Sequence, residues 1–222
     1  MPSASPQPDA SPPVRRPSPA DVGPEDLGPG DDKRTWRRAL RAVRRERATT
    51  RDRVDDGGRL AEAVSALWAD QGQPPCVAAY LSLPTEPPTE ALLHRLVSAG
   101  ARVLLPEMLD DRDLDWRAVT AAPLDGTVEV GPRLGLHTVG QAGLVVVPAL
   151  AVDGEGTRLG QGGGSYDRAL VRRSPDALVV ALLHDGELVP AGRLPHEPHD
   201  ARVHVVVTPG AAPVRCTGAP ED

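Results

Sequence analysis

The sequence predicts an α/β domain of three layers, in which helices cover both faces of a largely parallel central sheet. Short apolar runs alternate with longer stretches of helical periodicity, and this alternation is typical of strands joined by crossover helices. With 222 residues, the chain is long enough for one such domain with a sizeable core, and for a tail besides.

The composition argues against nucleic-acid-binding, secreted and membrane-spanning proteins. A formal net charge of −6 gives no indication of general nucleic-acid affinity. The N-terminus has no apolar signal-peptide core, and no apolar run approaches the roughly 18 residues of a membrane span. Cys76 and Cys216 lie far apart in the sequence, which favours two free thiols over a disulfide. We therefore expect a soluble, cytoplasmic protein.

Three segments are expected along the chain. Residues 1–31 are rich in Pro, Ser, Ala, Asp and Gly and carry too few large apolar side chains to offset the entropy of ordering, so a disordered tail is predicted. Residues 32–210 carry the periodic apolar pattern and form the domain. Residues 211–222 are expected to be a flexible C-terminal tail.

The elements of the domain follow from local patterns. The first helix, from Lys33 to Ala48, is strongly basic and begins after two aspartates that are able to cap it. Further helices are predicted at 58–70, at 89–99 and at 166–173. Strands are predicted for the apolar runs at 76–83, 102–105, 114–120, 144–147, 177–183 and 203–208, with 114–120 at an edge of the sheet.

The expected ligand site lies in the loops that follow the strands, because parallel sheets bind ligands beyond the carboxyl ends of their strands. Those loops are residues 82–88, 106–113, 148–165, 184–187 and 195–200.

The loop from Arg158 to Asp167 reads RLGQGGGSYD and has four glycines among its ten residues. It follows an apolar strand and precedes a helix, so that backbone N–H groups can face an anion while Arg158 adds a bidentate cation. The loop lacks the Gly-Lys-Ser/Thr ending of a P-loop, and it does not follow the first strand as a dinucleotide fingerprint does. On this pattern alone, a phosphate cradle and a tight strand-to-helix turn are equally good interpretations.

Five ionisable positions outside the glycines are considered beside this loop. Lys33 is the one lysine among 25 basic residues, although a basic helix face is usually solvated surface. Asp167 suits a Mg²⁺ ion that bridges phosphates, or an ordinary place at a helix start. His196 and His199 lie near Asp200, but without a third well-spaced ligand they do not indicate a transition-metal site.

Several segments together form a longer and more specific pattern. Residues 147–167 contain VPALAVD and then GTRLGQGGGSYD. The basic helix from Lys33, the Y-x-S-x-x-x-E-x-x-T run from Tyr80, the Leu105-Pro106 pair and the LPHEPHD segment at 194–200 accompany them. In order and spacing, these segments resemble the 5-formyltetrahydrofolate cyclo-ligase (5,10-methenyltetrahydrofolate synthetase) family, whose signature is V-P-x-x-A/F-x-D-x-x-G-x-R-L-G-x-G-x-G-x-Y-D.

The resemblance implies conversion of 5-formyltetrahydrofolate to 5,10-methenyltetrahydrofolate, ADP and phosphate, with ATP and Mg²⁺ as the required cofactors. The formyl oxygen would attack the γ-phosphate, and N10 would then close the ring as phosphate leaves. Such phosphoryl transfer needs positioning and charge neutralisation more than covalent help from the protein. The implied partner is the small-molecule folate, and we expect a monomer that binds neither nucleic acid nor membrane.

The resemblance also implies roles for individual residues. The catalytic cations would be Lys33 and Arg158, and Mg²⁺ would be held by Asp167 and Asp200. The folate would be bound by Tyr80, Glu86, Glu129 and Tyr166. ATP would be bound by Lys33, Arg37, Arg158, Leu159, Gly160, Gln161, Gly162, Gly163, Gly164, Tyr166 and Asp167.

The sequence departs from the family pattern at three positions. Ser165 stands where the family commonly has an aromatic residue, Gln161 where Tyr or Arg is frequent, and Val130 where a Glu-Pro pair would place its proline. Two alternatives therefore accompany the leading hypothesis. One is a degenerate family member that binds folate or nucleotide without turnover, and the other is an α/β enzyme that acts on another phosphate-bearing substrate.

Overall fold

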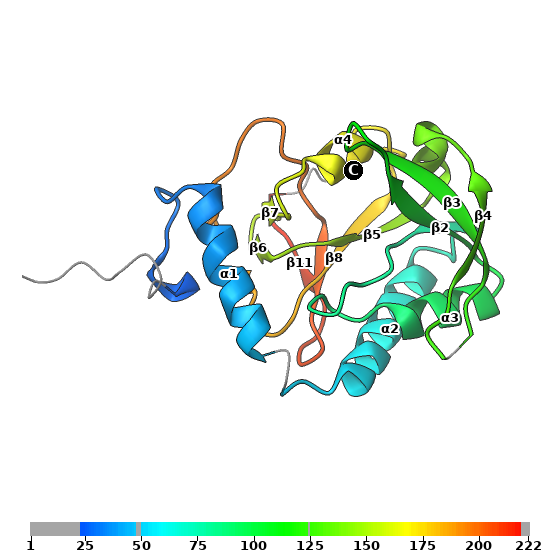
Figure 1. Ribbon diagram of the computed structural model, residues 1–222, viewed down its shortest axis with the longest axis horizontal. Coiled ribbons are helices and arrows are strands. Elements are labelled where there is room, and N and C mark those ends of the chain that lie inside the picture. Colours follow the sequence, from blue (N-terminus) through cyan, green and yellow to red (C-terminus); the bar gives the residue numbers. More distant parts are fainter. Residues whose placement is uncertain (1–22, 48–49, 124, 219–222) are drawn as a thin grey trace, which may run out of the picture.

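The computed structural model describes residues 23–47, 50–123 and 125–218, and it confirms the predicted α/β class (Figure 1). A large sheet runs through the centre of the molecule, helices lie on both of its faces, and a small second sheet stands beside it. None of the described helices combines the length and the apolar character that a membrane span requires.

Eight strands form the main sheet. In spatial order they are β11 (Val214–Arg215), β10 (Val205–Val207), β8 (Leu178–Leu182), β5 (Leu144–Pro148), β1 (Cys76–Ala78), β2 (Arg102–Met108), β3 (Leu114–Ala121) and β4 (Glu129–Arg133). The five strands from β10 to β2 are parallel, whereas β3, β4 and β11 pair antiparallel at the two edges. The carboxyl ends of the parallel strands therefore meet along one side of the sheet.

The remaining elements surround this sheet. The helices are α1 (Lys33–Arg47), α2 (Arg53–Asp70), α3 (Glu90–Ser98) and α4 (Ser165–Leu170), with two 3₁₀ turns, η1 (Pro24–Asp26) and η2 (Leu136–Gln141). The second sheet contains β6 (Ala151–Asp153), β7 (Arg158–Leu159) and β9 (Leu188–Val189), in the order β7-β6-β9.

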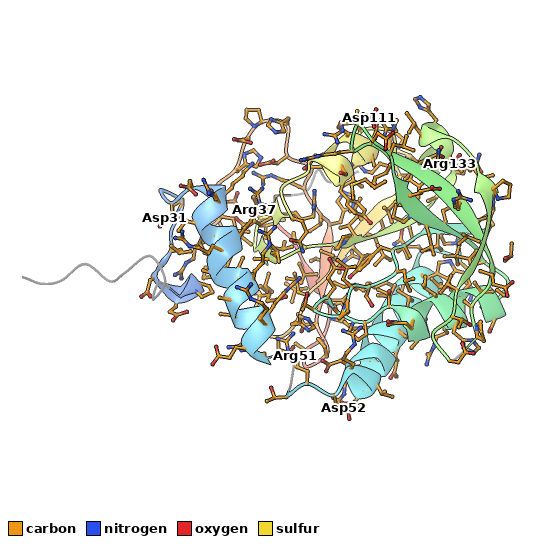
Figure 2. The ribbon with its side chains drawn as sticks, viewed as in Figure 1. Asp31, Arg37, Arg51, Asp52, Asp111 and Arg133 are labelled. Atoms are coloured by element: carbon orange, nitrogen blue, oxygen red, sulfur yellow. The ribbon has the colours of Figure 1, made fainter. Side chains whose placement is uncertain are left out.

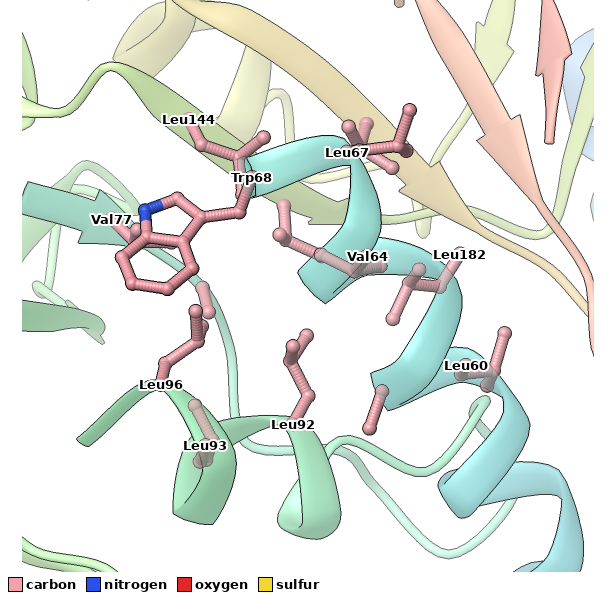
Figure 3. Close-up of a cluster of buried hydrophobic side chains, with 14 of the residues drawn as sticks. Leu60, Val64, Leu67, Trp68, Val77, Leu92, Leu93, Leu96, Leu144 and Leu182 are labelled. Atoms are coloured by element: carbon pink, nitrogen blue, oxygen red, sulfur yellow. The ribbon is translucent and has the colours of Figure 1, made fainter. Parts of the chain in front are cut away.

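Strand alternation divides the core into two layers, because successive side chains of a strand point to opposite faces. On one face, Leu144 and Val146 of β5 pack with α2 and α3, where Leu60, Val64 and Trp68 recur at helical spacing (Figure 3). On the other face, Val145 and Val147 pack with residues of α4 and η2. The continuous apolar strands of the sequence are thus buried on both sides.

Helix α1 packs away from both layers, against the small sheet. Its buried Trp36 and Leu40 form a third cluster with Leu27, Leu150 and Leu159. Figure 1 shows α1 beside β6 and β7 and separated from α2. The helix therefore reaches the glycine loop after β7 directly.

Several element boundaries differ from those predicted. The strand expected at 76–83 ends at Ala78, and the one expected at 102–105 continues through Pro106 to Met108. Beyond Leu105, β2 pairs only with β3, so Pro106 occupies an edge-like position where a missing N–H is tolerated. The segment 114–120 is not at an edge, because β4, whose polar sequence EVGPR gave no strand signal, pairs beyond it.

Two helices also differ. α2 starts at Arg53, five residues before the predicted start, because the Asp52 side chain accepts hydrogen bonds from the main-chain N–H groups of Val54 and Asp55. The helix predicted to end at Arg173 ends at Leu170. The predicted end of the first helix, Ala48, lies outside the described residues.

The predicted tails are described only in part, since residues 1–22 and 219–222 lie outside the described residues. The described parts of both tails contact the domain. The ordered domain therefore extends beyond the predicted boundaries at residues 31 and 211. Leu27 is buried, and Arg193 Nε donates to its carbonyl oxygen at 2.8 Å. At the other end, Val214 and Arg215 form β11. These contacts were not predicted, because single apolar residues within polar segments show no helical or strand periodicity.

Candidate active site

A cavity of about 1140 Å³ opens at the carboxyl ends of the parallel strands. It is lined by the segments that follow β1, β2 and β5, by α1, by the glycine loop and by residues 195–200. These include four of the five predicted loops. The fifth, at 184–187, is not part of the lining, because Glu187 points inward and binds Arg44. A cavity of this size suits small-molecule ligands.

The glycine loop adopts a backbone that requires glycine. Gly162 and Gly164 have φ angles of +102° and +68°, a left-handed region that other residues rarely adopt. A Cβ at three alternate glycines would meet an arginine head group, namely Arg158 at Gly160 (2.7 Å), Arg37 at Gly162 (3.3 Å) and Arg168 at Gly164 (3.0 Å). Three guanidinium groups therefore surround the loop. They supply most of its positive charge, since α4 has only 6 residues and a short dipole.

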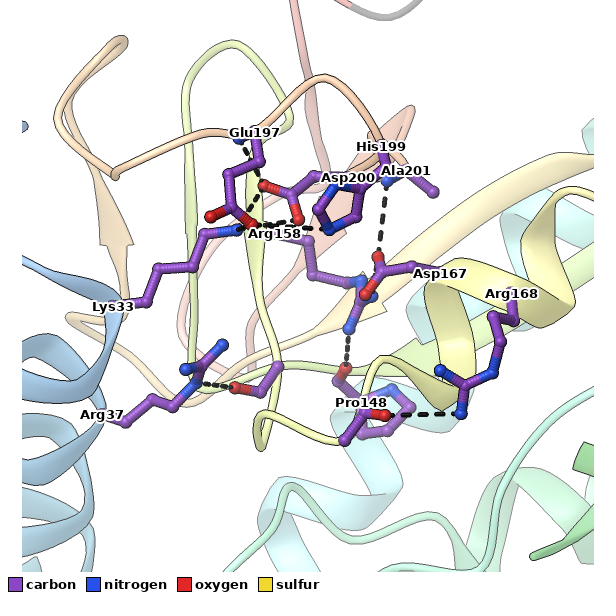
Figure 4. A network of polar contacts seen from close by, with 12 residues as sticks. Lys33, Arg37, Pro148, Arg158, Asp167, Arg168, Glu197, His199, Asp200 and Ala201 are labelled. Atoms are coloured by element: carbon purple, nitrogen blue, oxygen red, sulfur yellow. Dashed lines mark hydrogen bonds and ion pairs between the residues drawn. The ribbon is translucent and has the colours of Figure 1, made fainter. Parts of the chain in front are cut away.

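Arg158 is buried beneath the loop and joins it to α4. Its Nη2 donates to Asp167 Oδ1 at 2.6 Å (Figure 4). Its guanidinium carbon lies 5.8 Å from the centre of the Tyr166 ring. The main-chain N–H of Ala201 donates to the same Asp167 oxygen at 3.4 Å. Within the described part of the chain, the buried Nε of Arg158 has no hydrogen-bond partner. A buried donor without a partner is uncommon in proteins, so this N–H group marks a place where a ligand or water would complete the hydrogen bonding.

Lys33, the first residue of α1, lies between two carboxylates. Its Nζ donates to Asp200 Oδ2 at 2.7 Å and to Glu197 Oε2 at 2.8 Å (Figure 4). Burial lowers the pKa of Lys33, but hydrogen bonds to the two carboxylates outweigh it and raise the pKa above its ordinary value. Burial raises the pKa of Asp200, but the bonds from Lys33 and from the Glu197 main chain lower it overall. Both groups are therefore charged near neutral pH.

Two arginines of α1 contact the glycine loop directly. Arg37 Nε donates to the Gly160 carbonyl at 2.9 Å, and Arg41 Nη2 donates to the Gln161 carbonyl at 2.8 Å. Sequence reasoning included Arg37 and missed Arg41. The signal was available, because Arg41 lies four residues after Arg37 and so on the same helix face.

Tyr80, Tyr166 and Glu86 also line the cavity. The hydroxyl oxygens of both tyrosines are buried, and no described residue bonds to them. Burial, together with the Glu86 carboxylate, raises the pKa of both tyrosines, so their hydroxyls are neutral donors. Glu86 is buried, and its Oε2 accepts a hydrogen bond from the Leu83 main chain at 3.0 Å. This group suits a ligand with polar edges.

Apolar side chains form another part of the lining. Leu81, Leu83, Met108 and Val130 are 47%, 58%, 65% and 42% exposed, and all four line the cavity. We call these four residues the apolar wall. A flat apolar ligand that covered them would gain from removing their surface from water.

Glu129 is the one predicted site residue that is absent from the lining formed by the described residues. It is exposed at the start of β4, opposite Ala121, and its neighbour Val130 lines the cavity instead, as strand alternation requires. Its position does not support the predicted folate contact. The carboxylate on this side of the cavity is Glu107, which bonds Arg133 and Arg117; these bonds hold its pKa at about 2.

The sequence prediction omitted four other residues of this region. Glu107 and Arg117 line the cavity from the sheet, Glu197 bonds Lys33, and Arg168 Nη2 donates to the carbonyl oxygens of Arg112 and Gly163. Glu197 stands within the LPHEPHD segment, and Arg168 directly follows Asp167, so these two were close to recognised motifs. Glu107 follows the Leu105-Pro106 pair, whereas Arg117 lies on a strand without any recognised motif.

The comparisons with known proteins agree on one family. The model of the 5-formyltetrahydrofolate cyclo-ligase family matches residues 29–209. A 5-formyltetrahydrofolate cyclo-ligase of Mycolicibacterium smegmatis is 40% identical over 143 residues, which cover 60% of this chain and 73% of that protein. The protein of the same name in Escherichia coli K12 is 29% identical over 174 residues, which cover 74% and 94%.

Solved structures show the same fold. The 5,10-methenyltetrahydrofolate synthetase of Aquifex aeolicus matches with a TM-score of 0.60 and 23% identity, over 84% of this chain and 95% of that one. The enzyme of that name from Mycoplasma pneumoniae also has a TM-score of 0.60, with 14% identity, over 77% and 97%.

Proposed function

The chain belongs to the 5-formyltetrahydrofolate cyclo-ligase family, and we propose that it converts 5-formyltetrahydrofolate and ATP to 5,10-methenyltetrahydrofolate, ADP and phosphate. One observation carries the proposal: a single cavity joins a cationic region to an apolar one. Lys33, Arg37 and Arg158 stand beside the glycine loop, and the apolar wall lines the same cavity. The first region suits phosphates and the second suits a folate ring system.

The chemistry explains why a ligase needs both regions. An N-formyl oxygen is a poor leaving group until it carries a phosphoryl group. In the proposed reaction, this oxygen forms a bond to the γ-phosphorus, and ADP leaves with the electron pair of the broken P–O bond. N10 then attacks the formyl carbon and loses its proton to water, and the C–O bond breaks as inorganic phosphate departs. The protein holds the two substrates in line and neutralises charge.

Lys33 and Arg158 are proposed as the catalytic cations. Each is bonded to a carboxylate, Lys33 to Asp200 and Arg158 to Asp167. An entering γ-phosphate is a competing acceptor for Lys33 at the cavity mouth, and the unpartnered Nε of Arg158 gives a further donor. The remaining phosphates and the nucleotide would be held by Arg37, the backbone of residues 159–164, Tyr166 and Asp167.

Mg²⁺ fits this region by the chemistry of its donors, because the ion prefers carboxylate oxygens and water. Arg158 and the Ala201 main chain both bond Oδ1 of Asp167, which leaves Oδ2 for the ion or its water. Both oxygens of Asp200 are bonded to Lys33, so Asp200 fits after Lys33 has turned to phosphate. When bound, the ion would neutralise charge on the β- and γ-phosphates.

The folate is proposed to bind against the apolar wall. Glu86 would accept hydrogen bonds from the N–H edge of the pterin, and the hydroxyls of Tyr80 and Tyr166 would donate to its acceptor atoms. These three residues bring buried polar atoms to the cavity, two of them without a partner among the described residues. We also propose that the protein is a cytoplasmic monomer that does not bind nucleic acid, in line with its net charge of −6.

The deciding experiment is a turnover assay with purified protein, with and without ATP. We expect the absorbing methenyl product to appear only with Mg-ATP, together with one ADP per product. Absence of that product would exclude the proposed reaction. Binding of both substrates without turnover would identify a degenerate member, and a role for Ser165 in that loss would be tested by restoring an aromatic residue.

The metal proposal has its own test, which does not depend on turnover. Asp167→Asn should weaken the effect of Mg²⁺ on ATP affinity by about tenfold, measured by titration calorimetry with and without the ion. Asp176→Asn, a surface aspartate beyond α4, is the matched control. An unchanged Mg²⁺ effect in Asp167→Asn would remove this residue from the metal site.

A further inference from the structure

The cavity has a second cationic group, on the side formed by the sheet, that the proposed reaction does not use. Arg117 of β3 and Arg133 of β4 stand directly opposite each other in register. Arg117 lines the cavity, and Arg133 lines a smaller hollow of about 350 Å³ that shares Met108 with it. Figure 2 shows Arg133 on β4 and Arg37 on α1 at opposite sides of the molecule.

The hydrogen-bonding capacity of these two arginines is only partly used. Like charges directly opposite on neighbouring strands are unfavourable unless an anion lies between them. Glu107 provides that anion, since Arg133 Nη2 donates to its Oε1 at 2.7 Å and Arg117 Nε donates to its Oε2. Glu107 is the carboxylate that bonds the two guanidinium groups, while Asp115 and Asp110 attract them from further away. The side chains of Arg117 and Arg133 are 30% and 52% exposed, so their remaining N–H groups can reach a further carboxylate.

The shape of the substrate determines which of its parts reaches this side of the cavity. The formyl group reacts with the γ-phosphate, so it must lie near α1 and the glycine loop. In 5-formyltetrahydrofolate, the glutamate lies at the other end of the molecule, beyond the pterin and the p-aminobenzoyl ring, and it carries two carboxylates. Val130 of the apolar wall lies on β4 with Arg133, and Met108 lies on β2, which pairs with the β3 strand of Arg117; this suits a ring placed just before the carboxylates.

We propose that Arg117 and Arg133 bind the glutamate carboxylates of the folate, and that they make the protein prefer glutamate-bearing substrates to des-glutamyl ones. This inference rests on the proposed function, because it takes a folate as the ligand. Asp110 and Asp111 line the smaller hollow beside Arg133 and disfavour free anions there. A carboxylate tethered to a ring in the cavity instead approaches from the side of Arg117.

The test compares KM for 5-formyltetrahydrofolate with KM for 5-formyltetrahydropteroate, which lacks the glutamate, at saturating Mg-ATP. In the wild type, the glutamate should lower KM about tenfold, as expected for a charge-assisted hydrogen bond. We define the KM ratio as KM for the pteroate divided by KM for the glutamate-bearing substrate. Arg117→Gln and, separately, Arg133→Gln should raise KM for the glutamate-bearing substrate and bring this ratio toward one. Arg102→Gln is the matched control, an exposed β2 arginine that bonds Gln141, and it should keep the wild-type ratio.

Equal KM values in the wild type, or an unchanged ratio in both cavity variants, would overturn the proposal. If the Gln variants do not fold, the wild type alone decides the question. Salt screens exposed charge pairs, so the KM ratio should fall between about 0.02 M and about 0.5 M NaCl, and a constant ratio would also overturn it. Failure to turn over either substrate would refute the proposed function instead, so the two failures are distinguishable.

Discussion

The two ends of α1 are held by ion pairs of different character. Near the C-terminal end, Arg44 bonds both oxygens of Glu187 at 2.7 Å, and the two side chains are only 2% and 4% exposed. At the N-terminal end, Lys33 bonds Asp200 and Glu197 in the lining of the cavity, where the side chains of Lys33, Asp200 and Glu197 are 17%, 8% and 54% exposed. One pair is shut off from water, and the other is within reach of any ligand that enters.

This difference indicates that the two ends of α1 have different roles, one in stability and one in ligand binding. A buried ion pair has no substitute partner, because neither water nor ligand reaches it. A pair at the cavity mouth loses little when phosphate or water replaces the carboxylate. Arg44 therefore fixes α1 against the domain, whereas Lys33 remains exchangeable at the end that the proposed reaction uses.

The buried pair should give the largest effect. Arg44→Met leaves Glu187 buried without its cation and should lower the free energy of unfolding by about 3–5 kcal/mol, measured by urea denaturation. The double variant Arg44→Met/Glu187→Leu should recover most of this loss, because no charge is then left unpaired. A single-variant loss below about 1 kcal/mol would mean that Arg44 does not anchor the helix.

At the other end of the helix, Lys33→Met should affect catalysis much more than stability. Unfolding free energy should change by about 1 kcal/mol or less, while kcat/KM for ATP should fall about 100-fold through loss of a preorganised cation. Arg38→Met, an exposed site on the same helix, is the control for both measurements. Equal losses of stability in Lys33→Met and Arg44→Met would contradict the contrast between the two ends.

An apolar contact also supports the N-terminal end of α1. Leu27 is 4% exposed and packs in the cluster that contains Trp36. Leu27→Ala should lower the unfolding free energy by about 2 kcal/mol with little effect on turnover, measured by thermal unfolding and the methenyl assay. Val54→Ala, at a side chain that is 87% exposed, should change it by less than about 0.5 kcal/mol. A turnover loss as large as that of Lys33→Met would show that Leu27 positions the catalytic end.

The sequence predicted the centre of the fold better than its edges. The apolar runs that became β5, β8 and β10 are buried on both faces, so hydrophobicity alone marked them. β4 and β11 contain polar, exposed residues and are strands only because a neighbour pairs with them. Local patterns do not carry that information.

The same limit applies to the site. Motif residues such as Lys33, Arg158 and Glu86 do line the cavity, because fixed spacing before and after strands carries them to one edge. Glu129 does not line the cavity, because neighbouring residues of a strand point to opposite faces of the sheet and Val130 is the one that faces the cavity. The partnership of Arg44 with Glu187 spans 143 positions, and nothing in either local sequence indicates it.

The smallest expected effect is the pH dependence of the contact at the cavity mouth. The pKa of Asp200 is lowered in the folded protein, so its stabilising effect is present above the ordinary value of 3.8 and is lost as pH falls through the lowered pKa. The pKa of Lys33 is raised, so its effect is present below 10.5 and is lost as pH rises through the raised pKa. The contact should therefore stabilise between about pH 4 and about pH 10, by 1 kcal/mol or less.

Thermal unfolding of the wild type and of Asp200→Asn between about pH 3 and about pH 8 measures this contribution. The two melting curves should differ slightly at neutral pH and converge in acid, where protonated Asp200 no longer attracts Lys33. The difference should also shrink when a phosphate ligand occupies the cavity, because Lys33 then has another partner. A difference that persists in acid or is unaffected by ligand would show that Lys33 and Asp200 form a fixed structural contact, as Arg44 and Glu187 do.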